Sequence, residues 1–287
     1  MILLETATVT RRFGDTDAVA GVELRVEPGE VVGLLGANGA GKTTLIRLAL
    51  GLLHPTRGTV RLFEEPPSRE TRNRLGYLPQ GLGLYDDLTV AENLSFTARA
   101  FGHALDLGAL DPEIRTASRR LVRDLPLGLR RRVAFAAALA HDPELLVLDE
   151  PTSGVEPLAR ARLWETIRGA AEAGAGVLAT THHMSEASEC DRLVVLVQGR
   201  VAAAGTVRSI VGELRTVAVD ADRWEAAFAA LDAAGLPVAL VGRSLRVPGI
   251  PPERVDATLR GAQVTARLAV EPATFDEAFV AIARRAA

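Results

Sequence analysis

The stretch GANGAGKT at residues 36–43 follows an apolar run at 30–35 and precedes a segment, about 43–52, whose leucines recur at helical spacing. It fits the pattern G-x-x-x-x-G-K-[ST], in which glycines let successive backbone N–H groups point at phosphate oxygens. The β-branched run predicts a buried strand, and the leucine spacing predicts a helix whose N-terminus favours negative charge. These residues therefore predict a phosphate-binding loop between a strand and a helix.

Lys42 is the single lysine of this chain, although Lys and Arg together number 33. A lysine ammonium is a compact charge that fits inside a ring of backbone amides, whereas arginine is a wide planar fork. We expect Lys42 to reach the terminal phosphates of a nucleotide and the Thr43 hydroxyl to ligate Mg²⁺. The expected nucleotide contacts in this segment are Gly36, Asn38, Gly39, Ala40, Gly41, Lys42, Thr43 and Thr44.

Two acids end a second apolar run, Leu145-Leu146-Val147-Leu148-Asp149-Glu150. After a buried strand, Asp149 can hold Mg²⁺ and Glu150 can orient or deprotonate an attacking water, because phosphoryl transfer needs mainly positioning and charge neutralisation. Taken alone, such acids are as often helix caps. Together with the phosphate loop, they predict a phosphoryl-transfer site.

Composition excludes several classes of protein. The 287 residues are 48% hydrophobic and 24% charged, and the formal charge is 33 − 36 = −3, so no electropositive field indicates a nucleic-acid partner. One cysteine, Cys190, cannot form an internal disulfide, and no signal peptide or membrane-spanning apolar stretch is recognisable. We expect a cytosolic chain whose membrane role, if any, comes from a partner.

The order of the predicted elements indicates two domains. Strands alternate with helices through the first part of the chain, which predicts a mostly parallel sheet covered by helices. Helical patterns replace strands at about 85–140, which indicates an inserted helical subdomain. After residue 214 the order becomes βαββαβ plus a last helix, which is compatible with a small ferredoxin-like α+β domain. We predict domains at 1–212 and 213–287.

With these motifs, residues 1–212 resemble the nucleotide-binding subunit of an ABC transporter. The resemblance implies an α/β fold with a P-loop NTPase core of ABC type, and an ATPase that uses ATP and Mg²⁺. It also implies transmembrane permease subunits and a second nucleotide-binding subunit as partners, and a peripheral place on the cytoplasmic side of the cell membrane. An ABC-type ATPase acting on ribosomes or DNA is the rival, but the second ATPase core or long coiled coil of such proteins is missing here.

Further site residues follow from the resemblance alone. Phe13 occupies the place of the adenine-stacking aromatic, with a core aromatic as the alternative. Gln80 matches the glutamine that touches Mg²⁺ and the water, so that the implied metal set is Thr43, Gln80 and Asp149. His182 matches the switch histidine at the γ-phosphate, with His183 as the competing candidate. Glu150, His182 and Gln80 form the implied catalytic set.

The resemblance fails at two places. The family's L-S-G-G-Q signature, presented to the partner subunit's ATP, is Leu125-Pro126-Leu127-Gly128-Leu129 here, and its usual aspartate after Ser153-Gly154 is Glu156. Pro126 lacks the serine hydroxyl and an N–H, and Leu127 puts a side chain where glycine lets a backbone approach. We therefore expect pairing with a subunit that has an intact signature. The alternative is a structural or regulatory clamp with little hydrolysis.

Two features concern partners. Apolar residues near the helical subdomain supply surface for a short permease helix or, alternatively, for the subdomain core: Leu84, Tyr85, Leu88, Phe96 and Phe101. The segment 271–279 resembles the tail of drug, antibiotic or polysaccharide exporter ATPases, which favours export over import. The alternative is a dimerisation or regulatory domain that has no bearing on the direction of transport. The transported molecule is not encoded in this chain.

Overall fold

A computed structural model of the chain describes residues 1–242 and 244–286. Two units make up the fold, residues 1–201 and the residues from 202 onward. The boundary at 212 between an ATP-binding domain and an accessory domain stays a prediction.

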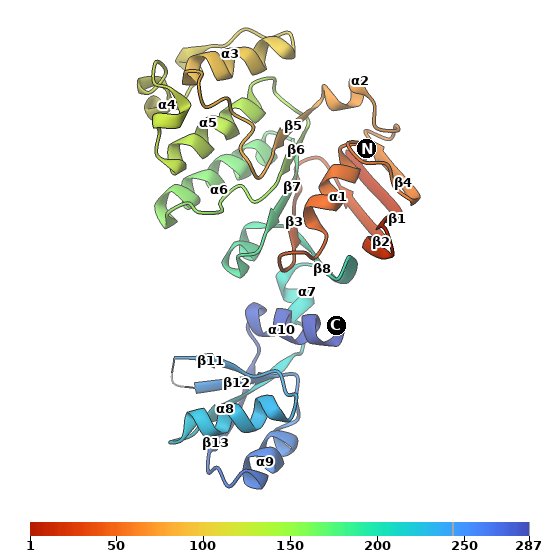
Figure 1. The fold of residues 1–287 in the computed structure, drawn as a ribbon, viewed down its shortest axis with the longest axis vertical. Coiled ribbons are helices and arrows are strands. Elements are labelled where there is room, and N and C mark those ends of the chain that lie inside the picture. Colours follow the sequence, from red (N-terminus) through yellow and green to blue (C-terminus); the bar gives the residue numbers. More distant parts are fainter. Residues whose placement is uncertain (243, 287) are drawn as a thin grey trace. The chain divides into compact units, whose positions relative to one another are not determined.

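Most strands of the first unit belong to a six-stranded sheet (Figure 1). In spatial order its strands are β5 (Leu75–Leu78), β6 (Leu145–Leu148), β7 (Gly176–Thr181), β3 (Val31–Leu35), β8 (Arg192–Val197) and β9 (Arg200–Gly205). The pairs β5/β6, β6/β7, β7/β3 and β3/β8 are parallel, as the alternation of strands and helices predicted. Neighbouring parallel strands end at one edge of a sheet, so the segments after β5, β6, β7 and β3 meet there.

A second, antiparallel sheet was missed by the sequence prediction. Its order is β2 (Thr16–Val26), β1 (Leu4–Phe13) and β4 (Arg57–Leu62). Helix α1 (Lys42–Ala49) lies between this sheet and the parallel sheet (Figure 1), and both sheets contribute to one apolar core with it. The register of β1 shifts between Thr6 and Val9 and again before Arg11, which interrupts the period-two alternation that marks a half-buried strand.

Three helices form the helical subdomain: α3 (Val90–Ala100), α4 (Pro112–Thr116) and α5 (Leu127–Leu139). The short 3-10 helices η1 (Leu107–Ala109) and η2 (Val122–Asp124) connect them. Thr89 and Glu92 form a reciprocal capping box that fixes the start of α3. Helix α6 (Pro157–Glu172) follows β6 and packs at its start against the start of α5, where Gly128 faces Ala159.

The remaining short elements of this unit are α2 (Arg69–Arg72), before β5, and η3 (Met184–Glu189), before β8. Helix α1 ends earlier than the leucine spacing predicted. Gly51 follows with a φ of +67°, a left-handed conformation that ends helices and favours glycine.

The second unit has the strand order β11 (Ala239–Val241), β12 (Ser244–Pro248), β10 (Arg215–Asp220) and β13 (Arg267–Pro272), with every pair antiparallel. With α8 (Trp224–Ala233) between β10 and β11 and α9 (Pro252–Gly261) between β12 and β13, this is the ferredoxin-like arrangement. Helices α7 (Val207–Val211) and α10 (Phe275–Ala286) precede and follow it.

The apolar pattern at 264–270 predicts the last strand of this order, but β13 starts only at Arg267. Val264 is only 6% exposed, but its backbone N–H donates to the carbonyl of Leu259 in a turn that ends α9. Gln263 has a φ of +55° in that turn. Val264 is therefore apolar because it fills the core two residues after the C-cap of α9, not because it belongs to a strand.

Candidate functional site

The segment 36–43 joins β3 to α1, as predicted, and close backbone approaches require glycine at positions 36 and 41. A Cβ on Gly36 would lie 2.6 Å from the carbonyl oxygen of Leu196, and one on Gly41 would lie 2.4 Å from that of Ala18. Gly39 and Gly41 also have φ values of +82° and +102°. These conformations let the loop wrap tightly ahead of α1, which starts at Lys42 without a side-chain cap.

Lys42 is buried at the centre of this loop, with 6% of its surface exposed. Its Nζ donates to the carbonyl oxygens of Gly36 at 2.7 Å and Ala37 at 3.2 Å. Burial lowers the pKa of Lys42, and the charges of Glu150 and Asp149 act in the opposite direction. The ammonium therefore sits in the same electrostatic field as the two acids, as phosphate and cation chemistry at one place requires.

The acid after β6 is held by a hydroxyl from the next strand. Asp149 is 1% exposed, and its Oδ1 accepts a hydrogen bond from Thr180 Oγ1 at 2.8 Å. Its Oδ2 is buried and has no hydrogen-bond partner among the described residues. A buried carboxylate oxygen without a protein partner fits a hard cation or the water ligand of one.

Glu150 is where the expected catalytic residues meet. Its Oε2 accepts a hydrogen bond from Gln80 Nε2 at 3.4 Å, and its Oε1 lies 3.5 Å from His182 Nδ1. Gln80 follows β5 and His182 follows β7, so the strand order β5-β6-β7 brings both to the acid after β6. The ring of His183 lies tilted beside that of His182, with centroids 4.2 Å apart, but it is His182 whose ring nitrogen approaches Glu150.

Phe13 is the last residue of β1, and 48% of its surface is exposed. The guanidinium of Arg11 lies 4.7 Å from its ring centroid. An exposed ring on a strand end is available for stacking. The alternative, that Phe13 is a core aromatic, does not fit this exposure.

The signature-like segment 126–128 forms the start of α5. Pro126 is the N-cap, without a side-chain hydrogen bond to the helix, and Leu127 is the first helical residue. Because the first-turn N–H groups of a helix have no intrahelical partners, the amides of residues 127–129 remain available as donors, and the first intrahelical bond runs from Arg130 N–H to Pro126 C=O. Leu127 is 45% exposed and packs over the loop between β6 and α6, with its Cδ2 3.1 Å from a Cβ position on Gly154.

Two residues of the site were missed by sequence reasoning. Thr180 bridges the acids, since its Oγ1 also accepts the backbone N–H of Glu150 at 2.8 Å. Arg131 is 6% exposed and donates from Nη1 to the carbonyl of Glu150 at 2.9 Å. A threonine inside an apolar strand is a sequence signal that could have identified Thr180. Arg131 gives no such signal, because the run Arg130 to Arg132 is typical of a solvated helix start.

The aromatic residues expected near the helical subdomain separate into two groups. Tyr85 and Phe96 are exposed and pair edge to face at 5.5 Å between centroids. Phe101 stacks on His141 and lines a cavity of ≈ 370 Å³ together with Tyr77 and Leu50. Leu84 packs against the subdomain core, as its alternative role predicted.

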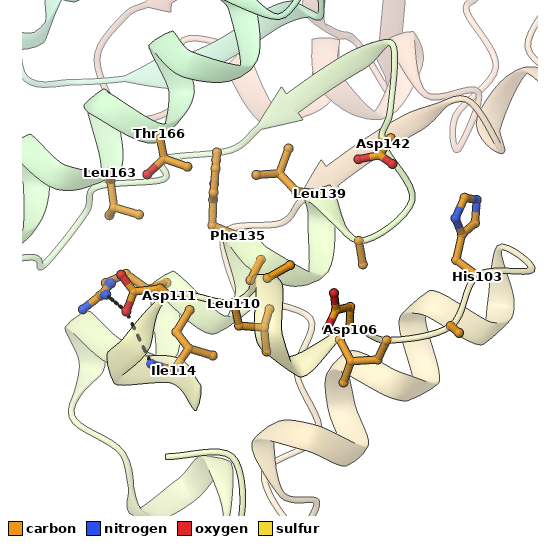
Figure 2. A pocket seen from close by; sticks show the side chains of 16 residues that line it. His103, Asp106, Leu110, Asp111, Ile114, Phe135, Leu139, Asp142, Leu163 and Thr166 are labelled. Carbon is orange, nitrogen blue, oxygen red and sulfur yellow. Dashed lines mark hydrogen bonds and ion pairs between the residues drawn. The ribbon is translucent and has the colours of Figure 1, made fainter. Parts of the chain in front are cut away.

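A second cavity, of ≈ 440 Å³, is lined by residues of the helical subdomain and by Leu163 and Thr166 of α6 (Figure 2). Leu110, Ile114, Phe135 and Leu139 point into it, and the ion pair between Asp111 and Arg132 closes one side. None of the expected nucleotide, metal or signature residues lines this cavity, so it is not part of the site above.

Within residues 1–242 and 244–286, no helix is both long and apolar enough to cross a membrane.

Comparisons with known proteins agree with this geometry. The family model described as ABC transporter matches residues 19–153. The Nod factor export ATP-binding protein I of Burkholderia lata is 43% identical over 219 residues, which cover 72% of this chain and 72% of that protein. The probable multidrug ABC transporter ATP-binding protein YbhF of Escherichia coli is 39% identical over 216 residues, which cover 71% of this chain but 37% of that protein.

Solved structures give the same result. A structure described as the ATP-binding subunit of an ABC transporter superposes with a TM-score of 0.67 at 30% identity, and the match covers 72% of this chain and 91% of that one. The resemblance inferred from the motifs, and the α/β fold expected from it, are confirmed.

Proposed function

The chain belongs to the ATP-binding subunits of ABC transporters, and we propose that it hydrolyses MgATP to drive a separate exporter permease. Members of this family are ATPases coupled to transport. One observation carries the proposal: Gln80, Glu150 and His182 converge at the carboxyl ends of neighbouring strands, beside the loop that holds Lys42. The proximity of these residues at one edge of one sheet supports the proposal, in which the loop is the phosphate cradle, Asp149 binds the metal and Glu150 orients the water.

In this proposal the phosphates bind to the backbone amides of residues 36–44, and Lys42 neutralises the β and γ phosphates. Mg²⁺ is held by the Thr43 hydroxyl, by Asp149 and by Gln80. The free, buried Oδ2 of Asp149 supports this role. A site with one carboxylate suits Mg²⁺, which usually takes its other ligands from water and phosphate.

Glu150 orients or deprotonates the water that attacks the γ-phosphate. Gln80 donates a hydrogen bond to one oxygen of that carboxylate at 3.4 Å, and His182 Nδ1 lies 3.5 Å from the other oxygen. His182 contacts the γ-phosphate in the same arrangement, and the exposed ring of Phe13 stacks on the adenine.

The chain acts as one half of a dimer that closes on ATP and reopens after hydrolysis. Each nucleotide then lies between the phosphate loop of one subunit and the start of α5 of the other. Since Pro126 replaces a serine there and Leu127 is 45% exposed, we propose that the partner subunit brings an intact signature. A homodimer that acts as a clamp with little hydrolysis is the alternative.

The permease docks on the apolar surface of the helical subdomain. The exposed pair Tyr85 and Phe96 and the cavity lined by Phe101 support this location. Bound in this way, the chain works on the cytoplasmic side of the membrane. The names of the two relatives above, an export protein and a probable multidrug transporter protein, support export as the direction. We assign the second domain an accessory or regulatory role.

The proposal is tested by ATP turnover of the purified chain, alone and with its co-purified membrane subunit. We expect turnover to require Lys42 and to rise when the membrane subunit is present. Turnover that is equal with and without the membrane subunit would contradict coupling to transport. Nucleotide binding without turnover in every assembly would favour the clamp.

A further inference from the structure

Arg131 connects the helical subdomain to the loop that carries Glu150. It is the fifth residue of α5, one helical turn after Leu127, whereas Glu150 follows β6 of the central sheet. Its Nη1 donates to the carbonyl oxygens of Glu150 at 2.9 Å and of Pro151 at 3.3 Å. A single guanidinium therefore joins α5 to the backbone on the carboxyl side of the catalytic acid.

This contact is buried, so the arginine cannot be a solvated surface charge. Arg131 is 6% exposed, although long charged side chains are almost never buried without partners. Burial lowers the pKa of Arg131, and the charge of Glu150 acts in the opposite direction. Because its guanidinium donates to carbonyl groups and not to the carboxylate, the carboxylate of Glu150 stays free to face Gln80 and His182.

Glu150 needs such a restraint because its backbone is strained. Its φ of +52° is in the left-handed region, which is uncommon for residues other than glycine and persists where surrounding contacts enforce it. Thr180 Oγ1 accepts the N–H of Glu150 at 2.8 Å. The C=O of Glu150 accepts from Arg131 at 2.9 Å and, within the loop, from the N–H of Ser153 at 3.2 Å, so Arg131 is its partner from outside the loop. The two peptide groups that flank Glu150 are thus held from opposite sides, which fixes where the carboxylate points.

We propose that Arg131 is a positioning residue for Glu150 and that it ties the orientation of α5 to the catalytic loop of the same chain. The inference rests on the proposed function, in which Glu150 orients the attacking water. Helix α5 then has two roles: its first turn faces the nucleotide bound by the partner subunit, and its Arg131 orients Glu150 of its own chain. Loss of the contact releases the strained loop and misplaces the carboxylate without touching the phosphate-binding loop.

The expected effect falls on turnover and not on binding. Misplacement of a catalytic group by about 1 Å costs on the order of 10²-fold in rate. For Arg131→Met we expect kcat of the complex with its membrane subunit to fall about 10- to 100-fold. The dissociation constant of MgATP should stay within about 3-fold of wild type, because Lys42 and the loop amides are unchanged.

The experiment compares four variants in that complex: Arg131→Met, Arg131→Gln, Glu150→Gln and the double variant Arg131→Met with Glu150→Gln. Arg131→Gln keeps one neutral donor, so it should recover part of the lost kcat, and it replaces the methionine variant if that chain does not fold. Arg132→Met is the matched control, since Arg132 pairs with Asp111 and Glu113 and does not contact Glu150. Its kcat should stay within about 3-fold of wild type.

The double variant separates positioning from general destabilisation. If Arg131 acts through Glu150, the double variant is no slower than Glu150→Gln alone, because residues in one network are not additive. Wild-type kcat in Arg131→Met beside a slow Glu150→Gln overturns this inference alone. Rate losses that multiply in the double variant also overturn it. Wild-type kcat in Glu150→Gln itself contradicts the proposed function, and the inference with it.

Discussion

Thr180 and Asp149 are joined by a buried hydrogen bond of 2.8 Å, in which the Thr180 hydroxyl donates to Oδ1 of the acid. The same hydroxyl accepts the backbone N–H of Glu150 at 2.8 Å. The single O–H of Thr180 is used on Oδ1, so this hydroxyl donates nothing to the second carboxylate oxygen of Asp149, which stays available for another ligand. Thr180, a residue of strand β7, therefore hydrogen-bonds to both acids that follow strand β6.

The first prediction concerns this hydroxyl. Thr180→Val has nearly the same shape but leaves the N–H of Glu150 and one oxygen of Asp149 unpaired, which costs about 1–3 kcal/mol. We expect the free energy of unfolding to fall by that amount in denaturant titrations, and ATP turnover to fall as well. Thr166→Val is the control, because its hydroxyl only contacts a carbonyl within α6, and it should change stability by less than about 0.5 kcal/mol. Equal stability losses in both variants would contradict the role of Thr180.

The second prediction concerns phosphate binding. Lys42→Ala removes the one ammonium available to the β and γ phosphates, a charge-assisted contact of about 1.5–3 kcal/mol. Affinity for MgATP should therefore fall about 10- to 100-fold, measured by equilibrium titration. An unchanged dissociation constant would rule out Lys42 as a phosphate ligand.

The third prediction concerns the start of α5. Pro126→Ser with Leu127→Gly returns a hydroxyl at the N-cap and removes the exposed side chain that packs over Gly154. A serine N-cap stabilises a helix by about 1 kcal/mol and a helical glycine costs about as much, so stability should change little. We expect ATP turnover of the homomeric assembly to rise about 10-fold or more, because a transition-state donor is restored.

Pro126→Ser alone is the control for that experiment, since it returns the hydroxyl but keeps the Leu127 side chain in place. It should raise turnover less than the pair does. If the pair leaves turnover of the homomeric assembly unchanged, the altered signature is not what limits it.

The fourth prediction concerns Cys190, the single cysteine. The thiol is 7% exposed, and burial raises its pKa to about 12. Because the thiolate is the reactive form, the native protein should not react with a thiol reagent at pH 8, and the unfolded protein should react once per chain. Rapid reaction of the native protein would contradict the burial of this residue between β3 and η3.

The site was predictable from sequence where a motif fixes both residue type and neighbours. The loop at 36–43 and the acids after β6 belong to this class, since strand, turn and helix signals are contiguous there. Parallel pairing then explains why Gln80 and His182 reach Glu150, because β5 and β7 flank β6. Their roles came from the family resemblance and not from local pattern.

The rest could not be predicted because it depends on tertiary contacts. Arg131 is one of three consecutive arginines, and only the packing of α5 against the β6 loop buries it while Arg130 stays accessible to pair with Asp86. The antiparallel sheet of β1, β2 and β4 was missed because register shifts interrupt its alternation. Val264 was assigned to a strand because an apolar residue just after a helix C-cap gives the same local signal.

The central claim, that Glu150 positions the water while the phosphate loop binds the nucleotide, is tested most directly by nucleotide trapping in Glu150→Gln. The variant, assembled with its membrane subunit, is incubated with radiolabelled MgATP, washed and analysed for bound ATP and ADP. We predict that affinity is retained, that turnover falls about 10²–10⁴-fold, and that the retained nucleotide is ATP. Wild-type turnover with ADP as the bound nucleotide would contradict the claim and assign the chemistry to another residue.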